Sequence, residues 1–473
     1  MRQGQTGSPV PGYHARVLES PVSSGDANLV TDLATEAVEA GAAPSGAAAA
    51  RASQRPSLWR HADYMKIWSA ATISLMGSQV SQLAVPFIAA VTLHATAFEV
   101  SLLAAIQMLP FLMFSLPAGA WLDRVRRRPV LIAGDLGRGA ALITIPVAYA
   151  LGVLTIWQLY AVAFAAGLLT VFFDVADQSY LPALLEPDDL VEGNAKLQIS
   201  ASAAQIVGPG AGGGMIALVG APFAIVADAA SFVASGGLIA LVRKHEPKPE
   251  RKRSADGRHT SLRHDIVEGL RYVLGDRHLR MIAACTGTSN LGSSMVFAIF
   301  PVFAFVQLGL SAALVGLAFG LGSFGILAGA MTAAPLSRRL GVGPMIVLSI
   351  LLSGPALLLL VLLPSEPLVA GPLLLVSQLL LGYSAVVYNV NQVSFRQAIT
   401  PLEMQGRMNA TMRFVVWGIM PVGAVLGGVT ASFIPLRETI LVAGLVSAAS
   451  FLWVLFSPVR SLREIPKQVR GPA

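Results

Sequence analysis

Twelve long apolar segments constrain this chain more than any other feature of its sequence. A helix needs roughly 20 apolar residues to cross a bilayer. We expect such helices near residues 65–90, 97–118, 129–150, 157–177, 195–218, 222–242, 279–307, 313–334, 344–363, 368–393, 408–433 and 436–457. Only 12% of the 473 residues are charged, against about 25% in a soluble domain. The sequence therefore predicts an all-α integral membrane protein with twelve transmembrane helices.

Basic residues are distributed unevenly between these segments. Lys and Arg gather in the even-numbered loops, above all between 243 and 278, and the odd-numbered loops hold almost none. Because basic loops stay in the cytoplasm, we expect a multi-pass protein of the inner (plasma) membrane with both termini cytoplasmic. The same topology accounts for the net charge of +7, so we expect a lipid bilayer and no nucleic acid as the partner of these charges.

The two halves of the chain resemble each other at one constant offset. Without gaps, this offset pairs Asn194 with Asn409, Gly208 with Gly423 and Phe173 with Tyr388. Parallel repeats joined by a long loop are a known architecture of membrane transporters. We expect a disordered cytoplasmic tail, a six-helix bundle, a cytoplasmic central loop, a second pseudo-symmetric six-helix bundle and a cytoplasmic tail, over residues 1–60, 61–243, 244–278, 279–458 and 459–473.

The loop after the second segment combines a glycine, an acid and several arginines: Gly119, Asp123, Arg124, Arg127 and Arg128. The glycine permits a tight turn, and the acid can face a helix N-terminus. An ordinary basic cytoplasmic loop is the alternative. The counterpart in the second half keeps Arg338 and Arg339 but lacks the acid, so we expect only the first copy to act as a conformational motif.

The fifth segment contains a run of helix-weakening residues that includes Gly208, Pro209, Gly212 and Gly213. Gly costs about 1 kcal/mol and Pro about 3 kcal/mol in a helix interior, so such a run needs a reason. Proline bends a helix, and glycines let a neighbouring helix approach closely. A generic kinked packing helix is the alternative.

Of the acids within or at the ends of apolar segments, where a charge costs about 2.5–3.5 kcal/mol, three are candidates for proton coupling. Asp174 and Asp177 lie near the end of the fourth segment, and Asp228 lies in the sixth. They could bind a proton, a cation or a polar group of a substrate. Helix caps, topological markers or buried pairing are the alternatives.

These motifs resemble those of the major facilitator superfamily. The loop from Gly119 to Arg128 is similar to its signature loop, and Gly208 to Gly213 is similar to the motif of its exporter branches, with Ala204 where a glycine is usual. Tyr180–Leu190 and Gly406-Arg407 are characteristic of the branch that holds the enterobactin exporter and the macrolide efflux pumps. The resemblance covers roughly residues 58–460.

The resemblance implies proton-coupled export, a latch role for the signature loop, and a central pathway surrounded by helices 1, 4, 7 and 10. Polar or aromatic candidates for that cavity are Ser78, Gln82, Phe173, Asn290, Tyr388 and Asn391. Hydrogen bonding between packed helices is their alternative role. The arginine often found in helix 4 of proton-coupled members is missing, because Phe164, Ala165 and Ala166 precede Gly167. Attention therefore shifts to Asp174 and Asp228.

We expect a secondary active transporter that exports a small hydrophobic or amphipathic molecule, such as an antibiotic, a drug or a siderophore, by proton antiport with alternating access. The sequence has no P-loop, no metal-ligand pattern and no catalytic constellation, so we expect no cofactor, no metal and no enzyme. We further expect a monomer. The alternatives are a transporter of another cargo, such as lysophospholipid or a solute taken up, and a non-transporting membrane sensor or scaffold.

Overall fold

The computed structural model describes residues 58–122, 125–186, 189–244, 246 and 262–463, and all elements belong to one unit, Leu58–Ala473. Twelve helical stretches in this part of the chain are long and apolar enough to cross a membrane. This confirms the predicted fold class. Most of the expected N-terminal tail, much of the central loop and most of the C-terminal tail lie outside the described residues.

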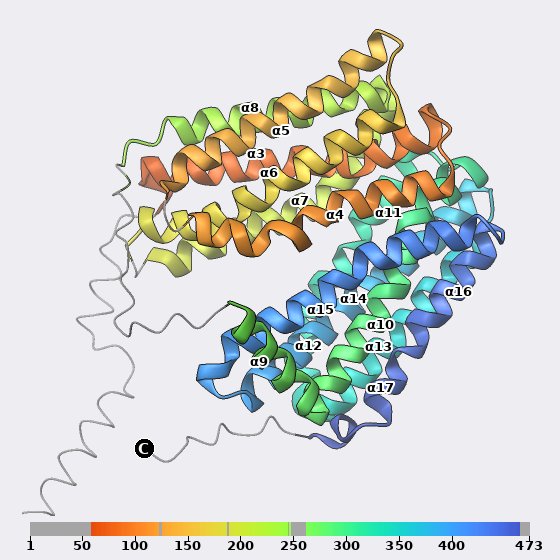
Figure 1. Cartoon of the computed structure of the whole chain (residues 1–473). Coiled ribbons are helices and arrows are strands. Elements are labelled where there is room, and N and C mark those ends of the chain that lie inside the picture. The colour runs from red at the N-terminus through yellow and green to blue at the C-terminus, as the bar shows by residue number, and fades with distance from the viewer. Residues whose placement is uncertain (1–57, 123–124, 187–188, 245, 247–261, 464–473) are drawn as a thin grey trace, which may run out of the picture. The chain divides into compact units, whose positions relative to one another are not determined.

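The first six spans pack among themselves (Figure 1). The short η1 helix (Leu58–Arg60) precedes them, and a π-helical turn, η2 (Ile88–Thr92), extends the first span. The spans are α3 (Ala62–Phe87), α4 (Ala97–Leu122), α5 (Arg127–Ala150), α6 (Ile156–Leu184), α7 (Leu190–Val219) and α8 (Ala221–Ala240).

The second six spans follow a shorter helix, α9 (Leu262–Gly275). They are α10 (Arg277–Pro301) with η4 (Val302–Gln307), α11 (Ala312–Gly322) with α12 (Phe324–Leu340), α13 (Val342–Leu358) with η5 (Leu359–Leu362), α14 (Pro367–Ile399), α15 (Leu402–Ala431), and α16 (Leu436–Ala449) with α17 (Phe451–Leu455). The short η6 (Pro458–Ser461) comes last.

Corresponding helices of the two groups begin at the offset that pairs Asn194 with Asn409. Such pairs of first residues are Ala62 and Arg277, Ala97 and Ala312, Arg127 and Val342, and Ala221 and Leu436. The offset seen in the sequence of the fourth and fifth segments therefore extends to the first, second, third and sixth helices of each group. The chain folds as two structural repeats, and we call two positions related by this offset matching positions.

The π-helical turns show how closely the repeats agree. In η2 the amide of Leu93 donates to the carbonyl of Ile88, and in η4 the amide of Leu308 donates to that of Phe303, both at 2.9 Å. A proline lies next to the end of the regular helix before one turn, Pro86, and at its end before the other, Pro301. The rings of Phe87 and Phe305 meet edge to face at 4.8 Å, which joins the two repeats at the end of the helices away from the central loop.

Candidate functional site

A cavity of about 1320 Å³ lies between the two groups of helices. Its walls come from α3, α4 and α6 of the first group and from α10, α11 and α15 of the second, with Leu270 of α9. The lining reaches from Pro86 and Phe305 to Gly406 and Arg407, near the start of α15. The cavity therefore extends toward the end of the helices that carries the central loop, which we call the loop end.

The cavity wall is mostly apolar and aromatic. Its aromatic lining residues are Phe111, Phe297, Phe300, Phe305, Phe319, Phe414 and Trp417. Polar groups are fewer: Ser81, Gln82, Gln107, Ser115, Asp174, Gln178, Arg407, Asn409, Thr411 and Arg413. An apolar pocket with a few convergent polar groups suits a ligand that is itself amphipathic.

Opposite charges from the two repeats share this cavity. Asp174 of α6 and Arg413 of α15 both line it, and they interact electrostatically. The guanidinium of Arg413 lies 5.0 Å from the centre of the Trp417 ring, and Trp417 lies 6.2 Å from the ring of Phe111 on α4. Charged and flat aromatic groups thus form one continuous surface that crosses from one repeat to the other.

A buried ion pair lies behind Asp174. Asp135 and Arg138 of α5 are 0% and 6% exposed, and a nitrogen of Arg138 lies 2.5 Å from a carboxylate oxygen of Asp135. Arg138 lies between the rings of Phe173 and Phe232, 4.2 Å from each ring centre. It also interacts electrostatically with Asp174 and Asp228. Arg138 is therefore the positive centre around which the acids of this repeat are arranged.

Asp228 of α8 faces α3 rather than the cavity. It is 1% exposed, and its carboxylate accepts a hydrogen bond of 3.2 Å from the hydroxyl of Ser231. Ser78 and Ser81 of α3 lie beside the same carboxylate. Because Ser81 also lines the cavity, this side chain stands between Asp228 and the cavity.

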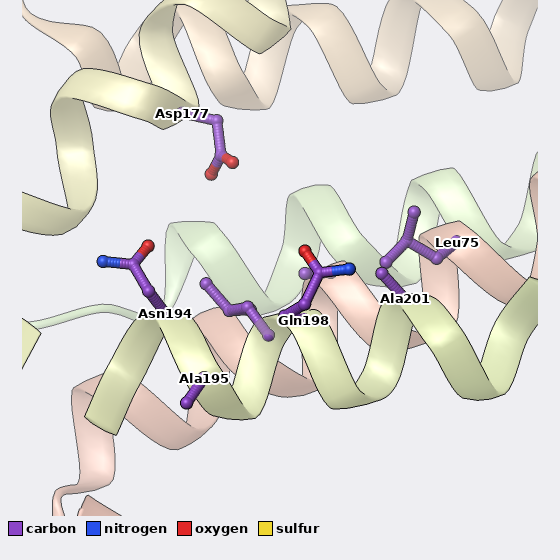
Figure 2. A pocket seen from close by; sticks show the side chains of 8 residues that line it. Leu75, Asp177, Asn194, Ala195, Gln198 and Ala201 are labelled. Carbon is purple, nitrogen blue, oxygen red and sulfur yellow. The ribbon is translucent and has the colours of Figure 1, made fainter. Parts of the chain in front are cut away.

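Asp177 lies one turn beyond Asp174 on α6 and faces a second, smaller pocket of about 520 Å³ (Figure 2). Asp174 and Asp177 lie seven or more residues before the last residue of α6, Leu184. They are therefore not caps of the helix end. The structure places Asp174 in the cavity, Asp177 in the second pocket and Asp228 in the helix interface.

The six predicted cavity residues have different positions. Gln82 lines the cavity, Ser78 lies beside Asp228, and Phe173 packs on Arg138. Asn290 donates to the carbonyl of Val416 at 3.0 Å, Tyr388 shares a 2.6 Å hydrogen bond with Thr286, and Asn391 accepts one from Ser337. These last three side chains join helices of the second repeat and do not line the cavity.

The predicted signature loop is described in part. Gly119 lies in α4, Asp123 and Arg124 lie outside the described residues, and Arg127 and Arg128 begin α5. The buried carboxylate of Glu246 accepts the amide hydrogens of Arg127 and Arg128 at 2.8 and 3.0 Å. An acid from the central loop thus satisfies the free amides at the N-terminus of α5.

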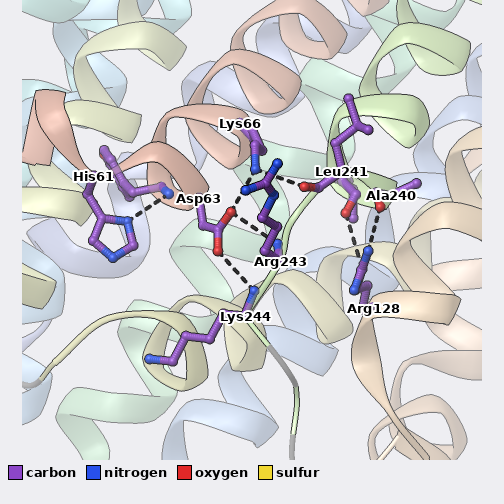
Figure 3. A network of polar contacts seen from close by, with 10 residues as sticks. His61, Asp63, Lys66, Arg128, Ala240, Leu241, Arg243 and Lys244 are labelled. Carbon is purple, nitrogen blue, oxygen red and sulfur yellow. Dashed lines mark hydrogen bonds and ion pairs between the residues drawn. The ribbon is translucent and has the colours of Figure 1, made fainter.

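Polar contacts also tie the end of α8 to α5 and α3 (Figure 3). Arg128 donates to the carbonyls of Ile239 and Ala240. Asp63 of α3 accepts the amides of Arg243 and Lys244 at 3.1 and 2.9 Å. These contacts join α3, α5 and α8 at the loop end of the first repeat.

The glycines of the fifth span lie where helices meet. Gly208 and Gly212 of α7 face Gln79 and Val80 of α3, and a side chain added at either would meet them. On the other side, Gly213 lies against the backbone of Ala312 and Ala313 at the start of α11, and the carbonyl of Pro209 lies against Gly316. The predicted motif thus joins α7 to α3 within one repeat and to α11 across the two.

The sequence interpretation missed Arg413 and Glu246. Arg413 is a single charge in an apolar run of the eleventh span, at the position that matches Gln198. An intramembrane charge is itself a signal for function, but its partner Asp174 belongs to the other repeat. Glu246 is an acid in a basic loop. This contrast is the feature of the sequence that could have identified it as a functional residue.

Comparisons with known proteins agree with this fold. The family model described as transmembrane secretion effector matches residues 56–470. The multidrug efflux pump Tap of Mycolicibacterium fortuitum is 27% identical over 380 residues, which cover 79% of this chain and 90% of the pump. The enterobactin exporter EntS of Citrobacter koseri is 23% identical over 417 residues, which cover 86% and 94%.

A solved structure of a bacterial homologue of the iron transporter ferroportin, in an inward-facing state, is also similar. It matches with a TM-score of 0.63 at 18% identity, over 84% of this chain and 100% of that one. At this identity the likeness concerns the fold alone.

Proposed function

Since the chain belongs to the transmembrane secretion effector family of the major facilitator superfamily, we propose that it exports a hydrophobic or amphipathic small molecule in exchange for protons. The family consists of transporters and not of enzymes. The chain is accordingly a multi-pass membrane protein with twelve spans in its described part. Cargo class, coupling ion and orientation form the proposal that follows.

The amphipathic cavity is the observation that carries the proposal. Its volume of about 1320 Å³ exceeds the usual range for small-molecule sites, about 300–1,000 Å³. Its aromatic walls suit a large apolar body, while Asp174, Gln178 and Arg413 offer charge and hydrogen bonds at one side. The relatives Tap and EntS are named as a multidrug efflux pump and an enterobactin exporter, and the proposed cargo, a drug or a siderophore, would combine an apolar body with polar groups.

The charge balance around the cavity supports proton coupling. Asp135, Asp174, Asp177 and Asp228 all interact electrostatically with Arg138, and Asp174 also interacts with Arg413. Four carboxylates lie with two guanidiniums, so when all are ionised the group can take up two protons before it becomes neutral. Arg138 and Arg413 supply the positive charge that an arginine in the fourth helix would otherwise provide.

Alternating access follows from the two repeats. The cavity extends to the loop end, and the contacts of η2 with η4 and of α7 with α11 join the repeats at the other end. With the basic loops in the cytoplasm of a cell bounded by its plasma membrane, this conformation faces inward. Both termini would then be cytoplasmic, and a single copy of the chain holds the whole cavity.

The proton gradient supplies enough free energy for this transport. One proton that moves down about 100 mV and about 1 pH unit yields about 2.3 and about 1.4 kcal/mol. Their sum sustains a cargo gradient of several hundredfold, because each step of about 1.4 kcal/mol is a factor of ten. A proton that binds an acid from the outside stabilises the inward-facing state, and cargo that binds there favours loss of the proton.

The test is accumulation of fluorescent dyes, macrolides and catecholate siderophores in efflux-deficient bacteria that express the chain. We expect lower accumulation of at least one compound, which a protonophore restores. A panel without any change, with the protein present in the membrane, would contradict the proposed export.

A further inference from the structure

The second pocket contains polar groups that the cargo cavity does not use. Its lining residues are Ala71 and Leu75 of α3, Asp177 of α6, and Asn194, Ala195, Leu197, Gln198 and Ala201 of α7. It shares no lining residue with the cargo cavity. A volume of about 520 Å³ holds several water molecules, each of which occupies about 30 Å³ in the liquid.

Three polar side chains converge in this pocket (Figure 2). Asp177 points from α6 toward α7, and the side-chain amides of Asn194 and Gln198 point back toward it. Asn194 and Gln198 are four residues apart, so they lie on the same face of α7 one turn apart, and both are exposed. Amide groups that flank a carboxylate in an accessible pocket can hold a chain of water molecules between it and solvent.

Asp177 also connects this pocket to the cargo cavity. It lies three residues after Asp174 on α6, on the same side of the helix, and the two interact electrostatically. Asp174 lines the cargo cavity. The charges that face Asp177 are Asp174 on its own helix and Asp135 and Arg138 on α5; the pocket residues of α3 and α7 are uncharged.

The second repeat has a different arrangement at the matching positions. The positions that match Asp177, Asn194 and Gln198 hold Gln392, Asn409 and Arg413. An amide replaces the acid and a base replaces the amide. Asn409 and Arg413 line the cargo cavity, and Gln392 is buried and donates to Asn389 at 3.1 Å. Of these two sets of matching residues, only the set in the first repeat includes a carboxylate, and that carboxylate lies in a pocket separate from the cargo cavity.

We propose that the second pocket is the port through which the coupling proton leaves the protein, separate from the site that binds the cargo. This inference rests on the proposed proton coupling. A proton on the Asp174 carboxyl passes to the Asp177 carboxylate, and Asp177 then gives it to a water molecule between Asn194 and Gln198. Asp174 is left ionised in the cargo cavity, and the pocket delivers hydronium to the loop end.

The first arm of the test measures access to water. Asn194→Cys and Gln198→Cys, each made with Cys285→Ala, are treated with a charged methanethiosulfonate in open membranes. Ile199→Cys, on a different exposed face of α7, is the control. We expect both pocket cysteines to react at least about tenfold faster than the control, because the attacking nucleophile is the thiolate, which forms where the cysteine is hydrated. Equal rates would overturn the port.

The second arm measures proton release. The full chain is reconstituted in liposomes with a pH-sensitive dye in the lumen, and Hoechst 33342 serves as the cargo probe. We expect Asn194→Leu with Gln198→Leu to slow Hoechst-driven proton movement at least about tenfold, less than the roughly hundredfold that loss of a proton-transfer group itself would cause, because the carboxylate of Asp177 remains. The affinity of this variant for Hoechst 33342 should stay within about twofold of that of the unaltered protein, which is about 0.4 kcal/mol in binding free energy.

Asn409→Leu, at the matching position of the second repeat, is the matched control. We expect it to change Hoechst affinity and to leave the rate of proton release per bound dye unchanged. Normal proton release in the Asn194→Leu and Gln198→Leu variant would overturn the port while leaving proton coupling intact. If the unaltered protein moves no protons, or if Na⁺ drives transport instead, both the proposed proton coupling and this inference are contradicted.

Discussion

The two repeats share one fold but differ in chemistry. The first repeat holds Asp135, Arg138, Asp174, Asp177 and Asp228 within its spans, and the matching positions of the second repeat are occupied by Ile350, Ser353, Asn389, Gln392 and Ala443. Helix starts, π-helical turns and glycine contacts are kept, whereas every one of these charges is replaced by a neutral residue. The fold therefore does not require the charges, and their cost in the membrane points to a function in the first repeat.

The glycine contacts illustrate what is kept. Gly213 of α7 faces the start of α11, and Gly428 of α15 faces Phe98 and Ser101 at the start of α4. Gly212 faces Val80 and Gly427 faces Met295. The paired glycines, and the residues Val80 and Met295, stand at matching positions. Close helix packing across the repeats is thus a property of the fold, and the ionisable groups are an addition to it.

The largest effect is expected from the buried ion pair. Arg138→Met leaves the carboxylate of Asp135, 0% exposed, without its counter-charge. Breaking a buried pair in this way costs about 3–5 kcal/mol. Ser353→Ala, at the matching position, removes only a hydroxyl bonded to Ile350 of its own helix and should cost about 1 kcal/mol or less. Unfolding in detergent micelles measures both.

A double variant tests whether the loss of stability comes from the unpaired charge. Asp135→Asn combined with Arg138→Met should recover most of the lost stability, since replacing both charges removes the unpaired one. Equal losses for Arg138→Met and Ser353→Ala would show that the two repeats do not differ at this position.

The next largest effect is expected at Asp174. Asp174→Asn should reduce proton-driven export at least about a hundredfold, a common contribution of one proton-transfer group, while leaving the protein folded. Asn389→Ala, at the matching position of the second repeat, should keep export within about twofold. Efflux of a fluorescent dye from energised cells is the measurement, and retained uphill export by Asp174→Asn would remove this residue from the mechanism.

A smaller effect is expected where the repeats meet. A methyl group at Gly213 would overlap the carbonyl oxygen of Ala312, whereas at Gly428 the nearest atom is the Ser101 hydroxyl and the nearest backbone atom, Cα of Phe98, is 2.9 Å away. Overpacking costs about 1–3 kcal/mol, and a side chain can move where backbone cannot. Gly213→Ala should therefore slow transport more than Gly428→Ala. If Gly428→Ala transports more slowly than Gly213→Ala, then the difference between a backbone neighbour and a side-chain neighbour does not determine the transport rate.

The smallest effect is expected for cargo affinity. Arg413→Gln removes a guanidinium of the cavity wall that lies over Trp417. An aromatic dye that packs on this guanidinium gains about 0.5–2 kcal/mol, so dye binding should weaken about two- to thirtyfold. Gln198→Leu, at the matching position of the first repeat, should leave affinity within about twofold. Fluorescence titration of the purified protein compares them, and unchanged binding in Arg413→Gln would place the cargo elsewhere.

The sequence predicted the spans well because apolar length alone determines them. The seventh was expected over 279–307 and forms Arg277–Gln307. Errors arise where helices continue past the apolar core. The fourth was expected to end near 177 and continues to Leu184, and the tenth was expected to end near 393 and continues to Ile399. Residues of these extensions, such as Tyr180, Leu184 and Phe395, are buried in clusters with residues of neighbouring helices, and a count of apolar residues along the chain does not register such packing.

The site was harder to predict because it depends on which face of a helix meets which neighbour. Polar residues in the second repeat, such as Tyr388 and Asn391, bond to other helices of that repeat. Gln82, from a similar polar stripe in the first helix, lines the cavity. Residue type and spacing do not separate these outcomes. The interaction between Asp174 and Arg413 joins positions in different repeats, and only the folded chain brings them together.

Dye transport into inverted membrane vesicles with an imposed pH gradient, acidic inside, tests the central claim most directly. Vesicles with the unaltered protein should accumulate the dye against its gradient, and they should lose it when the pH gradient is dissipated. Vesicles with Asp174→Asn should only equilibrate the dye. Uphill accumulation that persists without the pH gradient, or in Asp174→Asn, would contradict a proton-driven exporter whose coupling lies in the first repeat.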